Sequence, residues 1–275
     1  MITEIPNKNK DFASIIPGNI STYIYTDEEP YYKDYQHSYF AFTQRKGGWD
    51  CLRHYEILAN GCIPYFIDLE NCPTNTMHLL PKQLILEAMH LKGVHHGRID
   101  HSIFDKKRYY EILHELLEYM HQHLTTKAVA QYVLDAVNYK GSGNILFLGH
   151  NADEDYLKGS LLIGLKELLA DRVVDVPRLD HIYTNFTGNV KTLYGKGFSY
   201  TKIIDDVPIN RDNIEKRIKD KEFDLIIYAY VHHGKPYYNI ATQYYAPEQI
   251  LYICGEDTHQ CNSMHLHNFF LREYY

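Results

Sequence analysis

The chain has 275 residues, 45% of them apolar and 23% charged, which is ordinary for a globular protein with one large or two modest domains. Its net charge of −7 disfavours non-specific nucleic-acid binding and charge-driven docking on anionic lipid. No apolar run reaches the roughly 18–20 residues of a membrane-spanning helix, and the first residues lack the apolar segment of a secretory signal. We therefore expect a cytoplasmic protein with no transmembrane segment and no nucleic-acid partner.

The first third of the chain contains a predicted strand–loop–helix–strand unit. Residues 1–19 are polar and broken by proline and glycine, which predicts a loop, and residues 20–26 alternate as in a short strand. A β-rich run at residues 39–43 then leads through a polar, glycine-bearing turn at 44–48 into an amphipathic helix. A second β-rich run follows at residues 62–67. This order is typical of a nucleotide-binding βαβ unit.

Helices dominate the next part of the chain. The spacing of apolar residues predicts them at residues 79–92, 105–120 and 125–138. A histidine-rich loop at residues 93–101 separates the first two. Asp105 and either Thr125 or Thr126 are suited to cap the second and third helices. The stretch Gly141-Ser142-Gly143 is the clearest linker signal, so we place a domain boundary there.

After this linker, strands and helices alternate. Strands are predicted at residues 145–148, 173–176, 200–204, 225–231 and 250–254, and helices at residues 155–170, 211–221 and 237–245. Such alternation implies right-handed crossovers and a doubly wound sheet. The predicted fold is therefore α/β with two Rossmann-like halves, one over residues 1–140 and one over residues 143–275.

Arg53 and Glu56 lie three residues apart in the helix predicted after the glycine turn, so they share one helix face. On spacing alone, an ordinary surface ion pair explains them as well as a ligand site does. Their neighbours favour a ligand site, because Gly47 and Gly48 allow close backbone approach at a helix start, where N–H groups attract anions. Other nearby groups that can stack, pair or hydrogen bond are Arg45, Lys46, Trp49, Asp50 and His54.

The same segment resembles the donor-binding segment of exostosin-like glycosyltransferases. In GGWDCLRHYEILANGCIPYF the positions that carry the resemblance are Arg53, Glu56, Ala59, Gly61, Cys62, Ile63 and Pro64. A later segment, HLTTKAVAQYVL at residues 123–134, resembles a closing helix of related sugar transferases from large algal viruses, the chlorovirus xylosyltransferase-like proteins. The resemblance covers about residues 20–140.

The resemblance implies a GT-B enzyme, in which two Rossmann-like domains face each other across a cleft. It implies a nucleotide-sugar donor, with UDP-xylose as the first expectation, and a glycan acceptor, in the host cytoplasm if the protein is viral. Glu56 would hold the nucleotide ribose, and basic and glycine residues would hold the diphosphate. The implied donor-binding residues are Arg45, Lys46, Gly47, Gly48, Trp49, Arg53, His54 and Glu56. Common GT-B enzymes carry the donor half second, whereas here it comes first, so the halves are permuted or the first is abbreviated.

Three predicted strand ends in the second half carry polar groups, at residues 149–155, 232–234 and 255–259. Ligands bind beyond the carboxyl ends of strands in open α/β sheets, so these ends predict the lining of a cleft. The alternative is solvated loops in which Asp153 or Asp155 merely caps a helix. Sugar transfer with inversion needs a base that takes the proton of the acceptor hydroxyl. The candidate bases are Asp153, which we prefer, and His150, Asp155 and His232.

No metal ion or cofactor is expected beyond the donor itself. Asp153-Glu154-Asp155 has the outline of a metal-binding DxD motif, but the implied GT-B fold predicts transfer without a metal. Cys254 and Cys261, with His259, His265 and His267, lack the CxxC pair of a zinc site. The odd number of cysteines, five, predicts free thiols.

Two functions of other classes stay open. An enzyme that uses S-adenosylmethionine or NAD would place its cofactor on the loop within residues 145–155, but that loop has Gly149 alone in place of GxGxxG. A non-catalytic nucleotide- or sugar-binding module would use some of the 26 tyrosines for ring and hydroxyl contacts.

Overall fold

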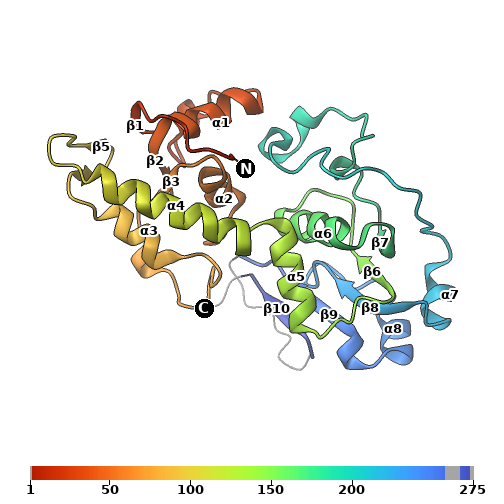
Figure 1. The fold of residues 1–275 in the computed structure, drawn as a ribbon. Coiled ribbons are helices and arrows are strands. Elements are labelled where there is room, and N and C mark those ends of the chain that lie inside the picture. The colour runs from red at the N-terminus through yellow and green to blue at the C-terminus, as the bar shows by residue number, and fades with distance from the viewer. Residues whose placement is uncertain (1, 258–266, 273–275) are drawn as a thin grey trace. The chain divides into compact units, whose positions relative to one another are not determined.

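The chain folds into two compact α/β units (Figure 1). The computed structural model describes residues 2–257 and 267–272. The first unit ends at Leu124 and the second begins at Thr125, whereas the sequence placed this boundary at residues 141–143. The reason is that the helix before those glycines, α5 (Thr126–Ala136), packs into the core of the second unit. The glycine stretch is therefore a loop within one unit.

The first unit is built on a three-stranded parallel sheet. Its strands follow chain order and are β1 (Lys10–Phe12), β2 (Ser38–Thr43) and β3 (Ile63–Phe66). Helices α1 (Glu28–His37) and α2 (Leu52–Ala59) connect them in turn. Every residue of the central strand β2 is buried, as its apolar, aromatic sequence requires. The predicted strand–loop–helix–strand unit is confirmed.

The segment before β2 differs from the prediction. Residues 1–19, predicted as a loop, contain β1, and residues 20–26, predicted as a strand, contain only a 3₁₀ turn at Ile20–Thr22. The alternating pattern misled because Ile20 and Ile24 are 83% and 60% exposed, so no sheet buries that face. Helix α1 was missed because its tyrosines and charges give little apolar periodicity. A strand and a helix thus precede the unit that the sequence showed.

The rest of the first unit packs helices against this sheet. Its elements are α3 (Lys82–Met89), a hairpin of β4 (Val94–His95) and β5 (Arg98–Ile99), and α4 (Lys106–His123). Asp105 caps α4, as predicted, by accepting a hydrogen bond from the Arg108 N–H at 3.0 Å. The core between sheet and helices includes Phe40, Leu58, Ile63, Ile85, Ile112 and Leu113.

Lys8 is a buried cation beneath the surface of the first unit. Its ammonium donates to the Gln36 carbonyl at 2.8 Å, at the end of α1, and to the Gly61 carbonyl in the turn before β3. Burial lowers the pKa of Lys8 to about 8. The lysine thus joins the ends of two helices. Because its ammonium is buried, these hydrogen bonds come with a desolvation cost.

Stability is expected to rise with pH relative to a Lys8→Met variant. The folded pKa lies below the unfolded value of 10.5, so the cost of a buried ammonium is present in full below pH 8 and disappears between pH 8 and 10.5. The unfolding free energy of the wild type, minus that of Lys8→Met, should therefore rise by about 1.4 kcal/mol per pH unit over this range, by about 3 kcal/mol in total. Denaturant titrations of both proteins across this range measure the difference, and a pH-independent value would contradict the expectation.

The second unit is a five-stranded parallel sheet. In chain order its strands are β6 (Asn144–Leu148), β7 (Val173–Val176), β8 (Phe223–Tyr228), β9 (Ile250–Cys254) and β10 (Phe269–Leu271). Their order across the sheet is β10-β9-β8-β6-β7, which is the order 2-1-3-4-5 when read from the other edge. The chain leaves β6 toward β7 on one side and later returns to β8 on the other. The carboxyl ends of β6 and β8 are therefore the topological switch point, where doubly wound sheets bind ligands.

Helices cover both faces of this sheet. One face carries α5 and α6 (Tyr156–Leu169), and the other carries α7 (Ile214–Lys219) and α8 (Tyr238–Tyr244). Helix α5 lies directly on α6 (Figure 1), because Gly164 lets the backbones meet. A Cβ atom at Gly164 would lie 2.0 Å from the Thr126 carbonyl oxygen, so no side chain fits there. The doubly wound fold predicted for the second half is confirmed.

Two strand predictions in the second unit need correction. Residues 200–204, predicted as a strand, form only one isolated bridge, between Ile204 and Tyr183. They belong to a long excursion between β7 and α7 that does not join the sheet. The last strand, β10, was not predicted because its three residues are too few to show a pattern. The predicted strands at residues 145–148, 173–176 and 250–254 are confirmed.

A buried ion cluster ties this excursion to the edge strand β7. Asp175 is fully buried, and its Oδ1 lies 2.9 Å from Lys166 Nζ of α6 and 2.7 Å from Arg211 Nη2. Arg211 also donates to the Asp175 carbonyl at 2.9 Å and to the Tyr183 hydroxyl at 3.3 Å. Burial lowers the pKa of Lys166, and the neighbouring Asp175 charge opposes that shift. One carboxylate thus balances two cations in this part of the core.

The cysteines are not all free thiols. Cys51, Cys62 and Cys72 are free, but Cys254 takes part in a disulfide, so the expectation of five thiols is wrong. Cys261 lies outside the described residues, as do His259 and His265. Within residues 2–257 and 267–272, no helix combines the length and the apolar character needed to cross a bilayer.

Candidate functional site

The loops that follow β1 and β2 leave the same edge of the first sheet, because both strands are parallel. The first loop carries Tyr23 and the second carries Lys46. The Tyr23 oxygen accepts hydrogen bonds from the Gly18 N–H at 3.1 Å and from Lys46 Nζ at 3.3 Å. The guanidinium of Arg53, in the first turn of α2, lies 5.4 Å from the centre of the Tyr23 ring. Two predicted site residues, Lys46 and Arg53, thus meet at a tyrosine that the sequence did not single out.

The surroundings of Tyr23 favour negative charge on its oxygen. Burial alone would raise the pKa of Tyr23, but the Gly18 N–H and the nearby cations Arg53 and Lys46 outweigh burial and lower it. Burial would likewise lower the pKa of Arg53, yet neighbouring phenols, led by Tyr35, raise it, so the guanidinium stays charged. Within the part of the chain that the structure describes, the buried Arg53 Nε has no hydrogen-bond partner.

Glu56 lies one turn beyond Arg53 on α2 and accepts a hydrogen bond from one phenol of α1, which a second phenol of α1 supports in turn. Tyr31 donates to Glu56 Oε2 at 2.6 Å, and Tyr35 donates to the Tyr31 hydroxyl at 3.0 Å. Burial, followed by the charge of Glu56, raises the pKa of both tyrosines, so both stay protonated and act as donors. Glu56 therefore sits beside Arg53 as a fixed acceptor, and a different tyrosine holds each of the two charged groups.

The structure places His54 and Trp49 inside the turn, which contradicts the prediction that they contact a ligand. His54 is 0% exposed, with Nε2 2.7 Å from the Trp49 carbonyl and Nδ1 2.9 Å from the Thr43 hydroxyl. A carbonyl only accepts, so Nε2 carries the proton and Nδ1 accepts from Thr43. Trp49 is 2% exposed and belongs to the core, with Arg45 at 5.7 Å from its ring. Both residues therefore stabilise the loop from its buried side.

The remaining predicted donor residues form the exposed tip of that loop. Arg45, Lys46 and Gly47 are exposed and Gly48 is half-buried, and the Lys46 N–H donates to the Gly48 carbonyl at 3.2 Å. Helix α2 begins just after, at Leu52, and its N-cap residue Cys51 supplies no side-chain hydrogen bond. The tip thus places two cations ahead of an uncapped helix start, a combination that suits an anion.

A second group of polar residues lies at the switch point of the second sheet. His150, after β6, packs against Gly234, after β8, because a Cβ at Gly234 would lie 2.6 Å from His150 Nδ1. Likewise, a Cβ at Gly255, after β9, would lie 2.6 Å from the Tyr230 ring. The three strand ends that the sequence marked therefore adjoin one another along this edge. This edge also holds all four predicted bases.

The four candidate bases differ in what they already do. Asp155 caps α6, since its Oδ1 accepts from the Lys158 N–H at 2.8 Å, so the capping alternative holds for this residue. Asp153 is exposed and accepts from the Asn151 amide, and His150 is exposed as well.

His232 is half-buried and thus more enclosed than His150 and Asp153. Its Nε2 lies 3.3 Å from Glu256 Oε2, and its ring centre lies 4.1 Å from that of Tyr230. Burial lowers the pKa of His232 although the Glu256 charge opposes this, so the imidazole is neutral at pH 7. A neutral imidazole can accept a proton, but enclosure leaves Asp153 better placed to meet a substrate.

Sequence reasoning missed residues that shape both edges. Lys158 is 1% exposed and holds the loop after β6 by donating to the Asn151 carbonyl at 3.1 Å and its side-chain oxygen at 3.2 Å. A lysine among apolar residues on the buried face of a predicted helix was the available signal. Tyr31 was detectable only as one tyrosine among many, since its partner Glu56 is 25 residues away in the chain.

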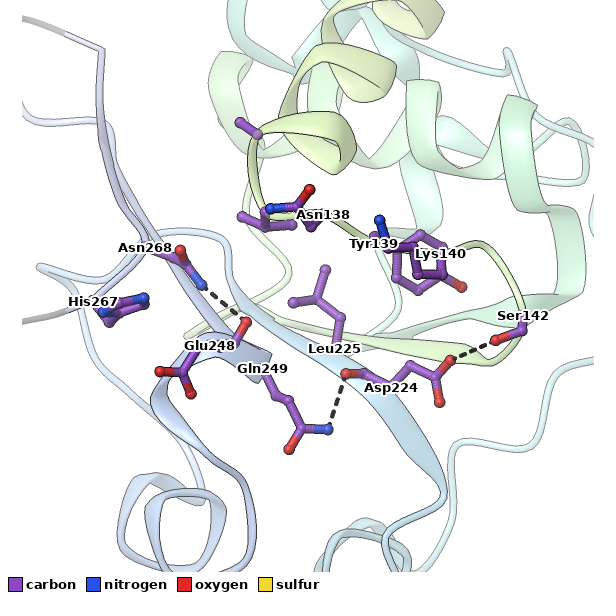
Figure 2. Close-up of a pocket in the computed structure, with 12 residues that line it drawn as sticks. Asn138, Tyr139, Lys140, Ser142, Asp224, Leu225, Glu248, Gln249, His267 and Asn268 are labelled. Atoms are coloured by element: carbon purple, nitrogen blue, oxygen red, sulfur yellow. Dashed lines mark hydrogen bonds between the residues drawn. The ribbon is translucent and has the colours of Figure 1, made fainter.

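A pocket of about 670 Å³ lies elsewhere, at the amino ends of β8 and β9 (Figure 2). It is lined by Ala136, Val137, Asn138, Tyr139, Lys140, Ser142, Asp224, Leu225, Glu248, Gln249, His267 and Asn268. Several of its polar groups bond to one another, for example Ser142 to the Asp224 carboxylate at 3.3 Å and Asn268 to the Glu248 carbonyl at 3.0 Å. No predicted site residue lines it, and it lies opposite the edge where parallel sheets carry ligands.

In residues 2–257 and 267–272, no three side chains of the metal-binding types gather closely enough to hold an ion. No protein-family description, curated protein or solved structure matches the chain. Its function therefore has to be inferred from the two polar edges themselves.

Proposed function

We propose that the protein is a glycosyltransferase that moves a sugar from a nucleotide-sugar donor to a glycan acceptor. The observation that carries the proposal is the pairing on α2 of a charged guanidinium, Arg53, with a fixed carboxylate acceptor, Glu56. The pair lies at the carboxyl edge of a parallel sheet, where such folds bind nucleotides. A nucleoside diphosphate offers groups that match both, anionic oxygens for the cation and ribose hydroxyls for the carboxylate.

In this proposal the donor lies along the loop after β2. Arg53, Lys46 and the exposed Arg45 neutralise the diphosphate as it becomes the leaving group, which is the charge that grows during transfer. Glu56, oriented by Tyr31, receives the ribose hydroxyls. The buried Trp49 and His54 support the loop and make no donor contact. UDP-xylose is the first donor to try, on the strength of the resemblance of the segment around Arg53.

The second unit supplies the base. Asp153 takes the proton of the acceptor hydroxyl as that oxygen attacks the anomeric carbon, and the configuration inverts. The proposal includes a GT-B-like arrangement with the donor-type unit first, a cytoplasmic location, and transfer that needs no metal. Asp153 suits this role because it is exposed at the switch point and does not cap the helix beside it.

Donor binding tests the proposal directly. Titration calorimetry with UDP, UDP-xylose and other UDP- and GDP-sugars should show one preferred donor. Arg53→Gln should weaken its affinity by about 10- to 100-fold, because a hydrogen bond to a charged group contributes about 1.5–3 kcal/mol. Glu56→Gln should weaken the ribonucleotide more than its 2′-deoxy analogue. Arg98→Gln and Glu118→Gln, two exposed sites elsewhere in the first unit, serve as matched controls.

Failure of every donor to bind would end the proposal. Binding of NAD or S-adenosylmethionine in place of nucleotide sugars would replace it with a Rossmann-type cofactor enzyme. Donor binding without turnover, unchanged in Asp153→Ala, would indicate a non-catalytic nucleotide-binding module.

A further inference from the structure

Two hydrogen-bond donors and a second cation, from three parts of the first unit, meet at Tyr23. The Tyr23 oxygen accepts from the Gly18 N–H at 3.1 Å and from Lys46 Nζ at 3.3 Å, and the Arg53 guanidinium lies against the same tyrosine, 5.4 Å from its ring centre. A neutral phenol oxygen accepts through its two lone pairs, and its own O–H also needs an acceptor. Convergent N–H groups and cations of this kind are what proteins build around an anionic oxygen. The arrangement therefore suits a phosphoryl oxygen better than it suits the phenol that occupies it.

The two cations also contact the face of the Tyr23 ring. Arg53 lies 5.4 Å and Lys46 Nζ 5.8 Å from the ring centre. The ring thus fixes where both charges stand, and the hydroxyl fills the point at which they meet. Arg53 Nε, buried and without a hydrogen-bond partner among the described residues, leaves this guanidinium with unused capacity beside that point.

The segment that carries Tyr23 is fixed mainly by local hydrogen bonds. Ile20 and Ile24, on either side of Tyr23, are 83% and 60% exposed, so they contribute little to the core. Thr22 bonds within the segment, to the Asn19 carbonyl at 2.7 Å and the Ile16 N–H at 3.0 Å. Withdrawal of the Tyr23 side chain would therefore uncover little apolar surface and cost little free energy.

We propose that the Tyr23 hydroxyl stands in for a phosphoryl oxygen in the ligand-free protein, and that a diphosphate displaces it from Lys46, Arg53 and the Gly18 N–H. This inference rests on the proposed function and extends it, because it makes Tyr23 the residue that sets diphosphate affinity. The phenol and the ligand compete for the same donors, so the phenol weakens binding while it keeps the cations apart and in place.

Inorganic pyrophosphate is the probe that tests this, measured by titration calorimetry on the full chain. Tyr23→Phe removes the competing oxygen and keeps the ring beneath both cations, so pyrophosphate should bind at least about fivefold more tightly than to the wild type. Tyr25→Phe, which removes a hydroxyl two residues away, is the matched control and should leave the affinity unchanged. An unchanged or weakened affinity in Tyr23→Phe would overturn the inference.

A second measurement follows the tyrosine itself. With ¹³C-labelled tyrosine, the Tyr23 signal can be assigned by its loss in Tyr23→Phe, and it should shift when pyrophosphate saturates the wild type. A signal that stays in place at saturation would also overturn the inference. If the wild type binds pyrophosphate and Arg53→Gln does not, but Tyr23→Phe behaves as wild type, the inference fails alone. If the wild type binds no pyrophosphate, the proposed donor site fails with it.

Discussion

Replacing Asp175 with asparagine is expected to lower the free energy of unfolding of the second unit by about 3–5 kcal/mol. The carboxylate is fully buried and pairs with Lys166 at 2.9 Å and Arg211 at 2.7 Å. The asparagine keeps the shape but removes the charge, so Lys166, whose side chain is 1% exposed, becomes a buried cation without a counter-charge. Denaturant unfolding followed by circular dichroism measures the loss.

Two further variants separate this explanation from general damage. Asp180→Asn removes an exposed ion pair with Arg178, which should change stability by less than about 1 kcal/mol. The double variant Asp175→Leu with Lys166→Met replaces the buried pair by apolar side chains, and it should be more stable than Asp175→Asn. If the double variant were less stable than Asp175→Asn, an unpaired charge would not be the cause.

Removing Asp153, the proposed catalytic base, is expected to have the other large effect. In the proposed reaction, Asp153→Asn should slow sugar transfer by about 10²- to 10⁴-fold, because general base catalysis typically contributes that much. Donor affinity should stay unchanged, since the donor lies on the first unit in this proposal. Single-turnover transfer at saturating donor measures the rate, and calorimetry measures the affinity.

The neighbouring aspartate provides the control. Asp155 accepts from the Lys158 N–H as the cap of α6, and asparagine caps a helix about as well as aspartate does. Asp155→Asn should therefore leave both the rate and the stability near those of the wild type. A normal rate in Asp153→Asn, together with a slow one in His150→Ala or His232→Ala, would reassign the base.

The sequence predicted most of the regular structure because local patterns carry it. The apolar run at residues 145–148 predicts strand β6, and Asp105 marks the start of helix α4, each from a few neighbouring residues. Elements without such a pattern were missed. Helix α1 is rich in tyrosine and charge, and β1 is too short to show alternation. The false strand at residues 20–26 had the right alternation but no sheet to bury it.

The candidate site was predictable in its location and less so in its parts. The three-residue spacing of Arg53 and Glu56 indicated that they share a helix face. The polar residues after the strands indicated the carboxyl edge of the second sheet. His54 and Trp49 looked like ligand groups, but the turn uses them for its own hydrogen bond and core. Tyr23 contacts Arg53 across 30 residues of chain, and no periodic pattern reaches that far.

The contact at Gly164 decides where the chain can flex between its two units. Because α5 meets α6 backbone to backbone, the glycine stretch at residues 141–143 joins elements that move together. Only Leu124 and Thr125 separate α4 from α5. Any hinge between the units must therefore be absorbed by the few backbone torsions at these two residues, one of which, Leu124, is anchored in the first core.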